Sequence, residues 1–318
     1  MRLSLRQLDY LVAIIDGGSM TRAAARLNVT PTSVSLQMKQ LEELFGTRLL
    51  VRHSRGVSAT DTGIAVYEHA QDILRRVADL ERLLPDGDAT APYNLRLGAV
   101  PAATRMLGIE AMAGVARNMK GATVMLSEGW ANELMEKLSA GTLDFVIAYD
   151  LEQTEEISVV EFFDDEFLFV CRPGCHPDGS LIDLSAVLSD DLVFFGKRSV
   201  SWRAVTEAAR ASGLAVARAQ EVQSIDVWRG MLCRGLGNSV APYSAVRDEV
   251  LRGDLAVHRI SGAPIIRRIG MAANRETLEF GRRIGFVGFM SELSQAMKPA
   301  FQGLGPNSAT QPTLHDTA

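Results

Sequence analysis

The chain has 318 residues and a formal net charge of −5, from 33 Lys and Arg against 38 Asp and Glu. Its composition, with 47% hydrophobic and 22% charged residues, excludes a disordered chain, and its length predicts two or three domains. The sequence shows neither a run of 18 apolar residues nor a secretory signal pattern, which predicts a cytoplasmic protein without a membrane span. Three cysteines favour a reducing compartment over a disulfide framework.

The charge is unevenly distributed along the chain. Residues 1–60 contain eight basic and four acidic residues, which gives +4, so residues 61–318 carry −9. This asymmetry predicts a small basic head on a larger acidic body.

Two short helices are predicted at the start of the basic head. The first covers residues 5–16 and ends at Gly17-Gly18, and the second runs from Met20 to Leu27 with Ser19 as its N-cap. One face of the first helix is apolar and is expected to be buried. Its members are Leu5, Leu8, Val12 and Ile15.

A third helix follows after a turn of about three residues. Thr30 is its predicted N-cap, Pro31 its first residue and Gly46 its stop. The side chains expected to face the core are Val34, Met38, Leu41 and Phe45. Two helices joined in this way form a helix-turn-helix pattern.

The outer surface of the third helix is polar, and its first turn is small and hydroxylic. Hydroxyls and backbone N–H groups there can bond phosphate, while Gln37 and Gln40 can reach base edges. The predicted DNA contacts on this helix are Thr30, Pro31, Thr32, Ser33, Ser35, Leu36, Gln37, Lys39 and Gln40. The alternative is a helical hairpin with a polar face and no role in DNA binding.

A basic hairpin is predicted directly after this helix. Residues 48–52 alternate as a strand, residues 53–56 form a turn, and residues 57–59 return. As a wing, this hairpin would place Arg52 and Arg55 on phosphates or in the minor groove. A solvated hairpin is the alternative.

The basic head resembles the DNA-binding domain of LysR-type transcriptional regulators. The segments that carry the resemblance within residues 5–63 are 18–24, 30–42, 46–52 and 60–63. The family usually has Gln where this chain has Thr30 and often Arg where it has Leu36, so base recognition is expected to differ. Phe is usual at the position of Leu50, which is a packing change.

A long helix is predicted to connect the head to the body, from residue 62 to about residue 84. Its apolar positions step by four and three, which is a heptad seam typical of a dimer contact: Val66, Ala70, Ile73, Val77, Leu80 and Leu84. The resemblance implies dimerisation here, and the alternative is packing on its own domain. Residues 85–92 are predicted to be a linker.

The acidic body is predicted to be α/β. Strands and helices alternate from residue 95 to residue 149, which indicates βαβ units and a parallel sheet. A second lobe is expected to start at the strand 166–171, and a single final helix covers about 277–297. The order of elements resembles the effector domain of the same family, with the two-lobed fold of periplasmic binding proteins. That resemblance implies crossings between the lobes near 162–165 and 263–267.

The predicted domains follow from these segments. They are a winged helix-turn-helix domain (1–60), a dimerisation helix and linker (61–92), an effector-binding domain (93–302) and a disordered tail (303–318). Within the effector-binding domain, lobe I comprises about 93–162 and 268–302, and lobe II about 163–267.

A small effector is expected between the lobes, where strand ends lead into helices. The candidate contacts are Pro101, Ala102, Ala103, Thr104, Ser127, Glu128, Gly129, Lys197, Arg198, Ser199, Ser201, Trp202 and Ser224. Helix N-termini together with Lys197 and Arg198 favour an anion. Each of these side chains serves equally well as a loop cap or packing residue, and Glu128 could instead repel an anion or bind an amine.

Other chemistry is weakly indicated. Cys171 and Cys175, followed by His176, have poor spacing for zinc and are interpreted as structural, with an oxidation-responsive regulator as the alternative. The motifs of catalysis, metal binding and cofactor binding are missing, so no enzyme activity, metal or cofactor is predicted. A solute-binding protein, or an enzyme with a DNA-binding head, remains a rival interpretation.

The sequence therefore predicts a ligand-responsive transcriptional regulator. Its expected partners are double-stranded DNA, a small effector for which an anion is favoured, and further copies of itself in a homodimer or homotetramer. RNA polymerase is a candidate partner, and a membrane is not expected.

Overall fold

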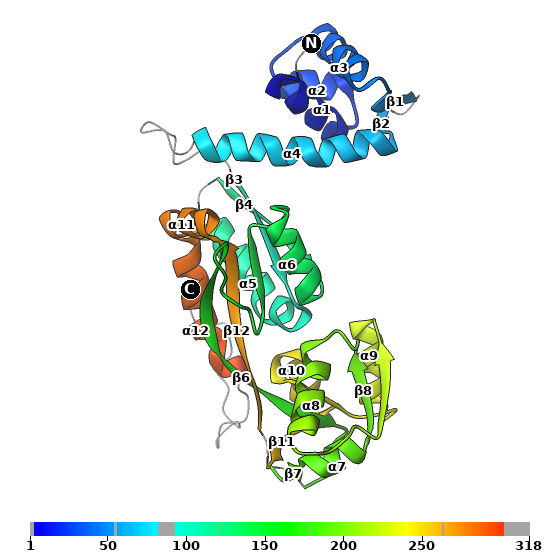
Figure 1. Cartoon of the computed structure of the whole chain (residues 1–318), viewed down its shortest axis with the longest axis vertical. Coiled ribbons are helices and arrows are strands. Elements are labelled where there is room, and N and C mark those ends of the chain that lie inside the picture. Colours follow the sequence, from blue (N-terminus) through cyan, green and yellow to red (C-terminus); the bar gives the residue numbers. More distant parts are fainter. Residues whose placement is uncertain are drawn as a thin grey trace. The chain divides into compact units, whose positions relative to one another are not determined.

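The computed structural model describes residues 3–53, 56–81, 93–119, 121–177, 179–262 and 264–301. The chain divides into two compact units, Met1–Ala91 and Pro92–Ala318 (Figure 1). Arg55, Leu84, the predicted linker 85–92 and the predicted tail 303–318 lie outside the described residues.

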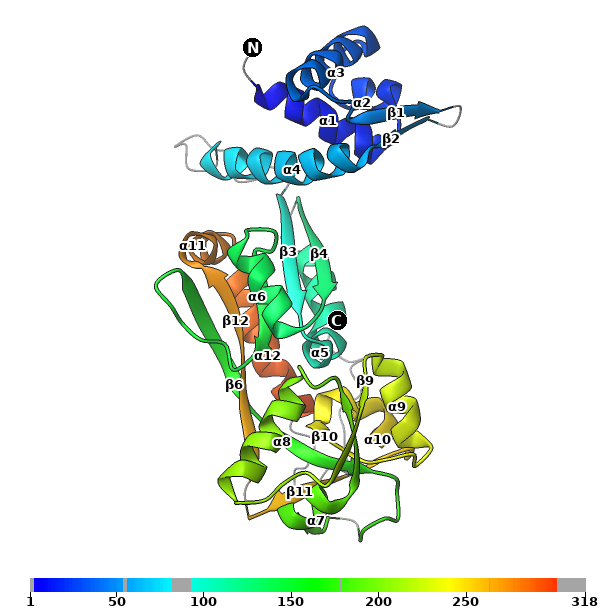
Figure 2. The same ribbon diagram turned by 45° about the vertical axis from the view of Figure 1, so that its right-hand side comes forward.

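The N-terminal unit is a three-helix group with a hairpin and a long helix (Figure 2). Its elements are α1 (Leu5–Gly17), α2 (Met20–Arg26), α3 (Pro31–Phe45), β1 (Leu50–His53), β2 (Gly56–Ala59) and α4 (Asp61–Glu81). The strands pair antiparallel, from Leu50 opposite Ala59 to His53 opposite Gly56. The winged helix-turn-helix and the long helix predicted from the sequence are confirmed, although β1 begins two residues after Arg48.

Short polar side chains begin each of the first three helices. Ser19 accepts a hydrogen bond from the backbone N–H of Arg22, and Thr30 accepts one from Ser33. Gly18 and Gly46 end α1 and α3 with φ of 59° and 67°, in the left-handed region that glycine adopts without strain. These caps explain why the helix boundaries could be predicted so closely.

The buried face of α1 differs from the predicted one. Leu8 is buried, but Leu5 is 45% exposed, and the core is built on Leu11 and Ile14 instead. The reason is that α1 packs against α2, α3 and α4 at once, so its buried surface is broader than a single stripe. On α3 the prediction fails for Phe45, which is 41% exposed at the last turn of the helix.

The C-terminal unit is built on an eight-stranded sheet that runs through both lobes. The strand order is β4-β3-β5-β12-β6-β11-β7, with β10 paired to β6. The strands of this sheet are β3 (Tyr93–Ala99), β4 (Ala122–Glu128), β5 (Phe145–Tyr149), β6 (Ile157–Cys171), β7 (Leu181–Asp183), β10 (Ser239–Pro242), β11 (Ala256–Ser261) and β12 (Ile265–Asn274). Two further strands, β8 (Asp191–Phe195) and β9 (Arg218–Val222), pair parallel to each other.

The parallel sheet expected from the sequence is only part of this arrangement. β3 pairs parallel with β4 and β5, but β12 pairs antiparallel with β5 and β6. The expected strand 166–171 is the end of the longer β6. A sequence of alternating strands and helices could not reveal this, because the antiparallel partners lie about a hundred residues apart in the chain.

Two long strands connect the lobes (Figures 1 and 2). β6 and β12 pair antiparallel from Ile157 opposite Asn274 to Phe167 opposite Ile265, with an irregularity between Ile269 and Gly270. Asp164 and Asp165 lie at this crossing, opposite Arg268 and Arg267. The lobes are therefore linked by a paired ribbon close to the predicted crossing points.

Helices cover the strands of both lobes. They are α5 (Pro101–Asn118), α6 (Ala131–Ser139), α7 (Leu184–Ser189), α8 (Val200–Ala211), α9 (Ile225–Cys233), a 3-10 turn (Tyr243–Ala245), α10 (Arg247–Leu251), α11 (Arg275–Arg283) and α12 (Phe286–Phe301). The single final helix predicted for 277–297 is wrong, because the chain breaks between α11 and α12 at Gly285, whose φ is 78°.

Candidate DNA-binding surface and effector pocket

The outward face of α3 is open, and its inward face is buried. Val34, Met38 and Leu41 have exposures of 0–2%, whereas Leu36 is 54% exposed and the Lys39 side chain 74% exposed. Thr32 and Ser33 are exposed as well, and Ser35, Gln37 and Gln40 are half-buried. The residues predicted to contact DNA thus share one surface of the helix.

The N-terminus of α3 is pre-organised by hydroxyl groups. The Thr30 Oγ1 accepts a hydrogen bond from Ser33 N at 3.2 Å and lies 2.9 Å from Ser33 Oγ. Pro31 has no N–H to leave unsatisfied. A small, capped first turn lets a helix end approach a phosphate backbone closely.

The wing is tied to α3 by an arginine. Arg52, on β1, donates from its guanidinium to Ser35 Oγ at 3.0 Å. This bond brings a cation of the wing onto the surface of α3, so the two elements form one continuous face. Lys39 lies 3.8 Å from Glu43 in an exposed pair, which is weak and leaves the ammonium group available to phosphate.

Close backbone contacts hold the wing against the helices. Glu42 accepts hydrogen bonds from the backbone N–H groups of Leu49 and Leu50 at 2.9 and 3.1 Å. A Cβ on Gly63 would lie 2.0 Å from the carbonyl oxygen of Leu49, so only glycine fits there. These contacts give Glu42 and Gly63, which lie within the family-like segments of the head, a role in positioning the wing.

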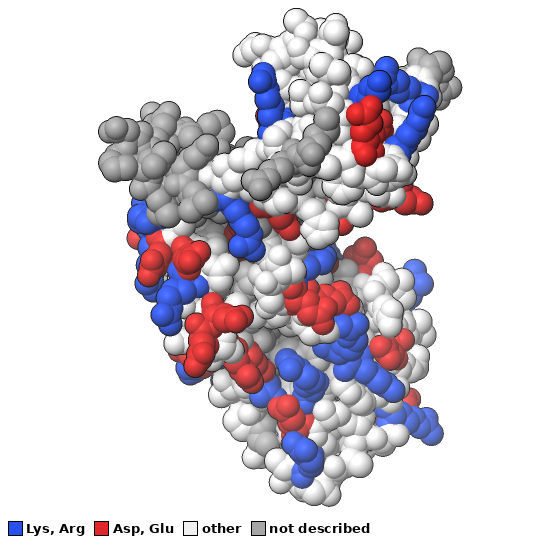
Figure 3. All heavy atoms as spheres, turned by 45° about the horizontal axis from the view of Figure 1, so that its top comes forward, with Lys and Arg blue, Asp and Glu red and all other residues white. Residues whose placement is uncertain are grey.

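Charged side chains of both signs are visible on both units (Figure 3). The N-terminal unit shows several Lys and Arg side chains, with acidic side chains beside some of them, and the C-terminal unit shows acidic and basic groups side by side. The difference in net charge is a property of the sequence, with +4 for residues 1–60 and −9 for residues 61–318.

Part of the predicted seam of α4 packs against the core of the N-terminal unit. Ala70 is fully buried and Val66 packs on the core of the N-terminal unit, whereas Ile73 is 39% exposed and Val77 half-buried. The side chain of Leu80 and all of Leu84 lie outside the described residues. Tyr67 ties α4 to α1 by donating to Asp16 Oδ1 at 2.6 Å.

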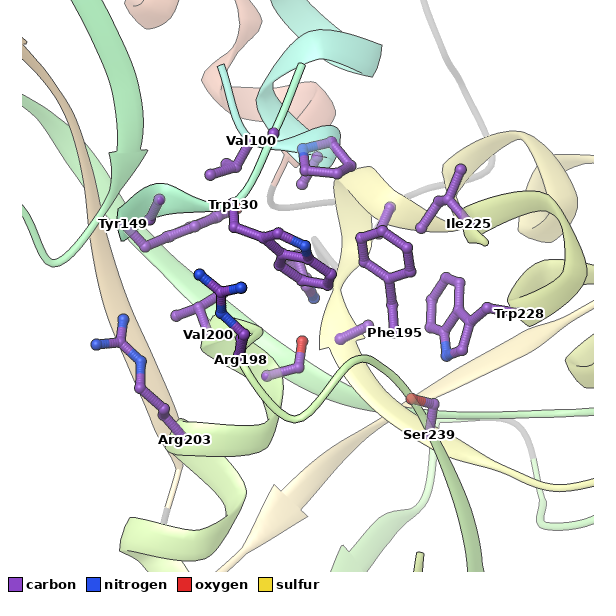
Figure 4. A pocket seen from close by; sticks show the side chains of 18 residues that line it. Val100, Trp130, Tyr149, Phe195, Arg198, Val200, Arg203, Ile225, Trp228 and Ser239 are labelled. Carbon is purple, nitrogen blue, oxygen red and sulfur yellow. The ribbon is translucent and has the colours of Figure 1, made fainter. Parts of the chain in front are cut away.

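A pocket lies between the two lobes of the C-terminal unit (Figure 4). Its interior space is about 80 Å³, and the volume rises to about 680 Å³ when the part open to solvent is included. Eighteen residues line it, and most of them are apolar. Val100, Trp130 and Tyr149 come from lobe I, and Phe195, Ile225 and Trp228 come from lobe II.

Two aromatic rings from opposite lobes stack inside the pocket. The ring centroids of Trp130 and Phe195 are 4.7 Å apart, with planes inclined by 24°. Gly196 makes room for this contact, because a Cβ there would lie 2.5 Å from the Trp130 ring. The stack therefore depends on the distance between the lobes, and any relative movement of the lobes would alter it.

The polar groups of the pocket are few and placed on different sides. Arg198 forms an ion pair with Glu133 of lobe I at 3.0 Å. Arg203 also lines the pocket, is exposed, and lies close enough to Asp150 for its charge to oppose the rise that burial causes in the pKa of that carboxyl. Ser239 is 1% exposed, and its hydroxyl has no hydrogen-bond partner among them.

Ion pairs and a buried acid join the lobes near the pocket. Arg105 of α5 lies 2.8 Å from Asp248 and 2.9 Å from Glu249 of α10. Tyr149, which lines the pocket, donates to Asp165 Oδ2 at 2.8 Å. Burial raises the pKa of Asp165 to about 7, against the opposing effect of the Tyr149 hydrogen bond.

The predicted effector contacts fall into two groups. Five of them line the pocket: Pro101, Ala102, Gly129, Arg198 and Ser201. The other eight, which lie outside the lining, are Ala103, Thr104, Ser127, Glu128, Lys197, Ser199, Trp202 and Ser224.

Several residues of the second group have visible structural roles. Ser199 and Ser224 cap α8 and α9. Lys197 lies with its Nζ 5.7 Å above the ring of Trp202, which itself packs edge-on against Phe194. For Ser199 and Ser224, the structure therefore shows the role of a loop cap, which was the alternative to effector binding.

The aromatic lining of the pocket was not among the residues predicted from the sequence. Trp130, Tyr149 and Phe195 each lie at or just beyond the end of a strand, which is a signal that could have found them. Trp228 lies in the first turn of α9, and Ser239 begins β10. No sequence pattern predicts a pocket position for Trp228 or Ser239, because the tertiary fold alone brings them into the lining.

The three cysteines are free. Cys171 is buried, and burial together with the neighbouring Cys175 raises the pKa of its thiol to about 12. Cys175 is exposed. Across the described ranges no three His, Cys, Asp or Glu side chains are grouped to hold a metal ion, and no helix is long and apolar enough to cross a membrane.

Two family models match the chain. The model described as bacterial regulatory helix-turn-helix protein, lysR family, matches residues 5–64, and the LysR substrate binding domain matches residues 91–280. The chain therefore belongs to the LysR family, and it is a DNA-binding transcriptional regulator with an effector-binding domain. The resemblance recognised in the sequence is confirmed.

Relatives and solved structures agree with this assignment. The nitrogen assimilation regulatory protein nac of Klebsiella aerogenes is 29% identical over 246 residues, which cover 77% of this chain and 80% of that protein. A probable hydrogen peroxide-inducible genes activator of Mycobacterium avium is 26% identical over 274 residues, covering 83% and 86%. A cysteine mutant of OxyR from Corynebacterium glutamicum has the same fold, with a TM-score of 0.64 and 22% identity over 94% and 96% of the two chains.

Proposed function

We propose that this regulator is controlled by a small effector bound in the pocket between the lobes of its C-terminal unit. The observation that carries the proposal is the pocket itself, which is apolar, is lined from both lobes and contains an inter-lobe aromatic stack. An effector in this position contacts both lobes and favours one lobe geometry over others. The protein is a regulator rather than an enzyme on this account, and it acts on DNA in the cytoplasm.

The DNA contact is assigned to the joint surface of α3 and the wing. Gln37 and Gln40 reach base edges in the major groove, while Lys39, Arg52 and Arg55 neutralise phosphates. The Arg52–Ser35 hydrogen bond supports this assignment, because it keeps the guanidinium of the wing on the α3 surface.

A homodimer built on α4 would supply two heads at a fixed spacing, and two dimers would form a homotetramer. The exposed Ile73 on the predicted seam supports this contact. Effector binding would then shift the dimers relative to each other and change the spacing or bend of the DNA. RNA polymerase is a candidate partner at a promoter.

Selection of bound fragments from random DNA by the full chain tests the DNA-binding part of the proposal. The expected result is enrichment of paired half-sites at a fixed spacing. Recovery of DNA without any common sequence would show that the assigned surface binds phosphates only.

An oxidation-responsive regulator is the second candidate, favoured by the relative described as a hydrogen peroxide-inducible genes activator. Against it, the Cys171 thiol is buried, and its raised pKa disfavours the reactive thiolate. Peroxide treatment followed by mass spectrometry of the Cys171–Cys175 segment decides between them. A disulfide that changes DNA affinity would support the second candidate, and unchanged thiols would support the first.

A further inference from the structure

We propose that Asp16 and Tyr67 clamp α4 against α1 and thereby fix the spacing of the two DNA half-sites that a dimer can occupy. Both are positioning residues in this role, because neither belongs to the surface assigned to DNA. The clamp acts through the proposed dimer of α4, so this inference rests on the proposed function and adds the residues that determine the geometry of that dimer on DNA.

α4 is anchored first where the chain leaves the wing. Thr60 Oγ1 accepts a hydrogen bond from the backbone N–H of Gly63 at 3.0 Å and donates to the carbonyl oxygen of Arg48 at 2.9 Å. Gly63 lies so close to the carbonyl oxygen of Leu49 that a Cβ would be 2.0 Å from it. These contacts fix the start of α4, but a single anchor point does not determine the direction of a helix.

A second anchor lies one turn further along α4. The Tyr67 hydroxyl donates to Asp16 Oδ1 at 2.6 Å, and Arg26 of α2 donates to Asp16 Oδ2 at 3.1 Å. Gln71, on the next turn of α4, donates to the Tyr67 hydroxyl oxygen at 2.7 Å and so orients it. One carboxylate therefore connects α1, α2 and α4, and the two anchors together define the direction of α4 relative to the head.

The chemistry of the contact agrees with a role between elements. Burial and the hydrogen bond to Asp16 raise the pKa of Tyr67 to about 12, so the hydroxyl stays protonated near neutral pH and can donate. Asp16 lies in the last turn of α1, where the helix dipole disfavours a negative charge. Its place is therefore explained by its contacts with Arg26 and Tyr67 and not by stabilisation of its own helix.

The apolar contacts beside the clamp are small. Ala70 is fully buried, but its side chain is a single methyl group, which allows close approach without interlocking. Ile73, less than one turn later, is already 39% exposed, and α4 extends beyond the three helices of the head (Figures 1 and 2). Because hydrogen bonds depend on angle, the polar contact at Tyr67 selects one tilt of α4.

A small tilt has a large effect because α4 is long. From Gly63 to its end at Glu81 the helix rises about 27 Å, so a tilt of about 10° would displace that end by about 5 Å. Successive base pairs are about 3.4 Å apart along the DNA axis. A tilt of this size in each head would therefore change the preferred spacing by at least one base pair.

Binding of the full chain to DNA with variable spacers tests the clamp. The DNA contains two copies of the half-site selected by wild type, separated by spacers of different length. Wild type is expected to prefer one spacing and to bind at least about tenfold more weakly when a base pair is added or removed. Tyr67→Phe keeps the ring but removes the hydroxyl, and it is expected to bind these neighbouring spacings within about threefold of the best one.

Matched variants separate the clamp from a general weakening of the head. Tyr10→Phe removes another phenol hydroxyl of this unit, whose hydrogen bond from Arg6 Nε at 2.9 Å stays within α1, and it is expected to keep the wild-type spacing. Asp16→Ala breaks the clamp from the other side. The double variant with Tyr67→Phe should tolerate no wider range than Asp16→Ala alone, because both changes remove the same contact.

Sedimentation and melting temperature complete the test. The expected result is a broadened spacing preference in Tyr67→Phe and Asp16→Ala, with dimerisation and the half-site sequence unchanged. A wild-type spacing preference in both dimeric variants would overturn the clamp even if their melting temperatures fall, because a purely structural contact changes stability alone. Equal broadening in Tyr10→Phe would overturn it as well. A wild-type chain without any preferred spacing would instead contradict the proposed dimer on which the clamp acts.

Discussion

At the scale of single residues, the proposed DNA-binding surface combines neighbouring side chains that have different roles. Lys39 and Arg52 are cations directed at phosphates, and Gln37 has the amide group that can distinguish bases. The sequence identified these residues because a helix fixes which positions share a face. Their assignment to DNA contacts is still a prediction.

Removing the cations should weaken binding to every DNA sequence. Lys39→Ala and Arg52→Ala are each expected to lower affinity and to reduce the slope of log affinity against log salt by about one. Fluorescence anisotropy over a salt series measures both effects. Lys197→Ala in the other unit is the control. An unchanged slope in the double variant would mean that DNA docks on another surface.

Changing Gln37 should have a different effect. Gln37→Ala is expected to alter which sequences are preferred, at a cost of about 1–3 kcal/mol on the best site, with the salt slope unchanged. Repeating the DNA selection with this variant is the measurement. Recovery of the wild-type sequence preference would exclude Gln37 from base recognition.

The buried carboxyl at the lobe crossing should make stability depend on pH. Burial raises the pKa of Asp165 from 3.8 to about 7 in the folded protein, so the unfolded chain releases this proton first as the pH rises. The contribution of the group to stability is therefore complete below pH 3.8 and is lost progressively up to about pH 7.

Asp165→Asn removes this dependence. Relative to wild type, the variant is expected to gain stability between pH 4 and pH 8, by at most roughly 4 kcal/mol. Urea unfolding followed by tryptophan fluorescence reports on the correct unit, because Trp130, Trp202 and Trp228 all lie there. A constant difference between variant and wild type across this pH range would contradict the assigned cause.

At the scale of elements, prediction succeeded where the signal is local. Ser19, Thr30 and Gly46 determine helix ends through their own hydrogen bonds and backbone angles, so the boundaries of the head followed from the sequence. Prediction failed where contacts between elements that are distant in the sequence determine which face is buried or in which direction a strand pairs. The buried face of α1 depends on three neighbouring helices, and the direction of β12 depends on strands far away in the chain.

The α4 seam offers an element-scale test of the proposed dimer. Ile73→Glu is expected to raise the dimer dissociation constant by at least about tenfold, since it places a charge in an apolar contact. Ala65→Glu adds the same charge at an exposed position of α4 outside the seam. Sedimentation over a concentration series compares the two. Equal dimerisation would show that α4 packs only on its own unit.

At the scale of the whole molecule, the charge of −5 is an average over a head of +4 and a body of −9. The two-unit organisation and the family followed from the sequence because motifs and element order survive at low identity. The pocket lining followed only in part. Trp228 and Ser239 reach it through the tertiary fold, so neither their spacing nor their neighbours in the chain marked them.

Regulation by an effector requires that the pocket and the DNA-binding surface influence each other. Footprinting of the full chain on its selected DNA, with and without a ligand that binds the pocket, measures this coupling. The ligand is expected to change the protected length or the affinity for DNA. Identical footprints with and without bound ligand would contradict the control of DNA binding by a ligand in the pocket.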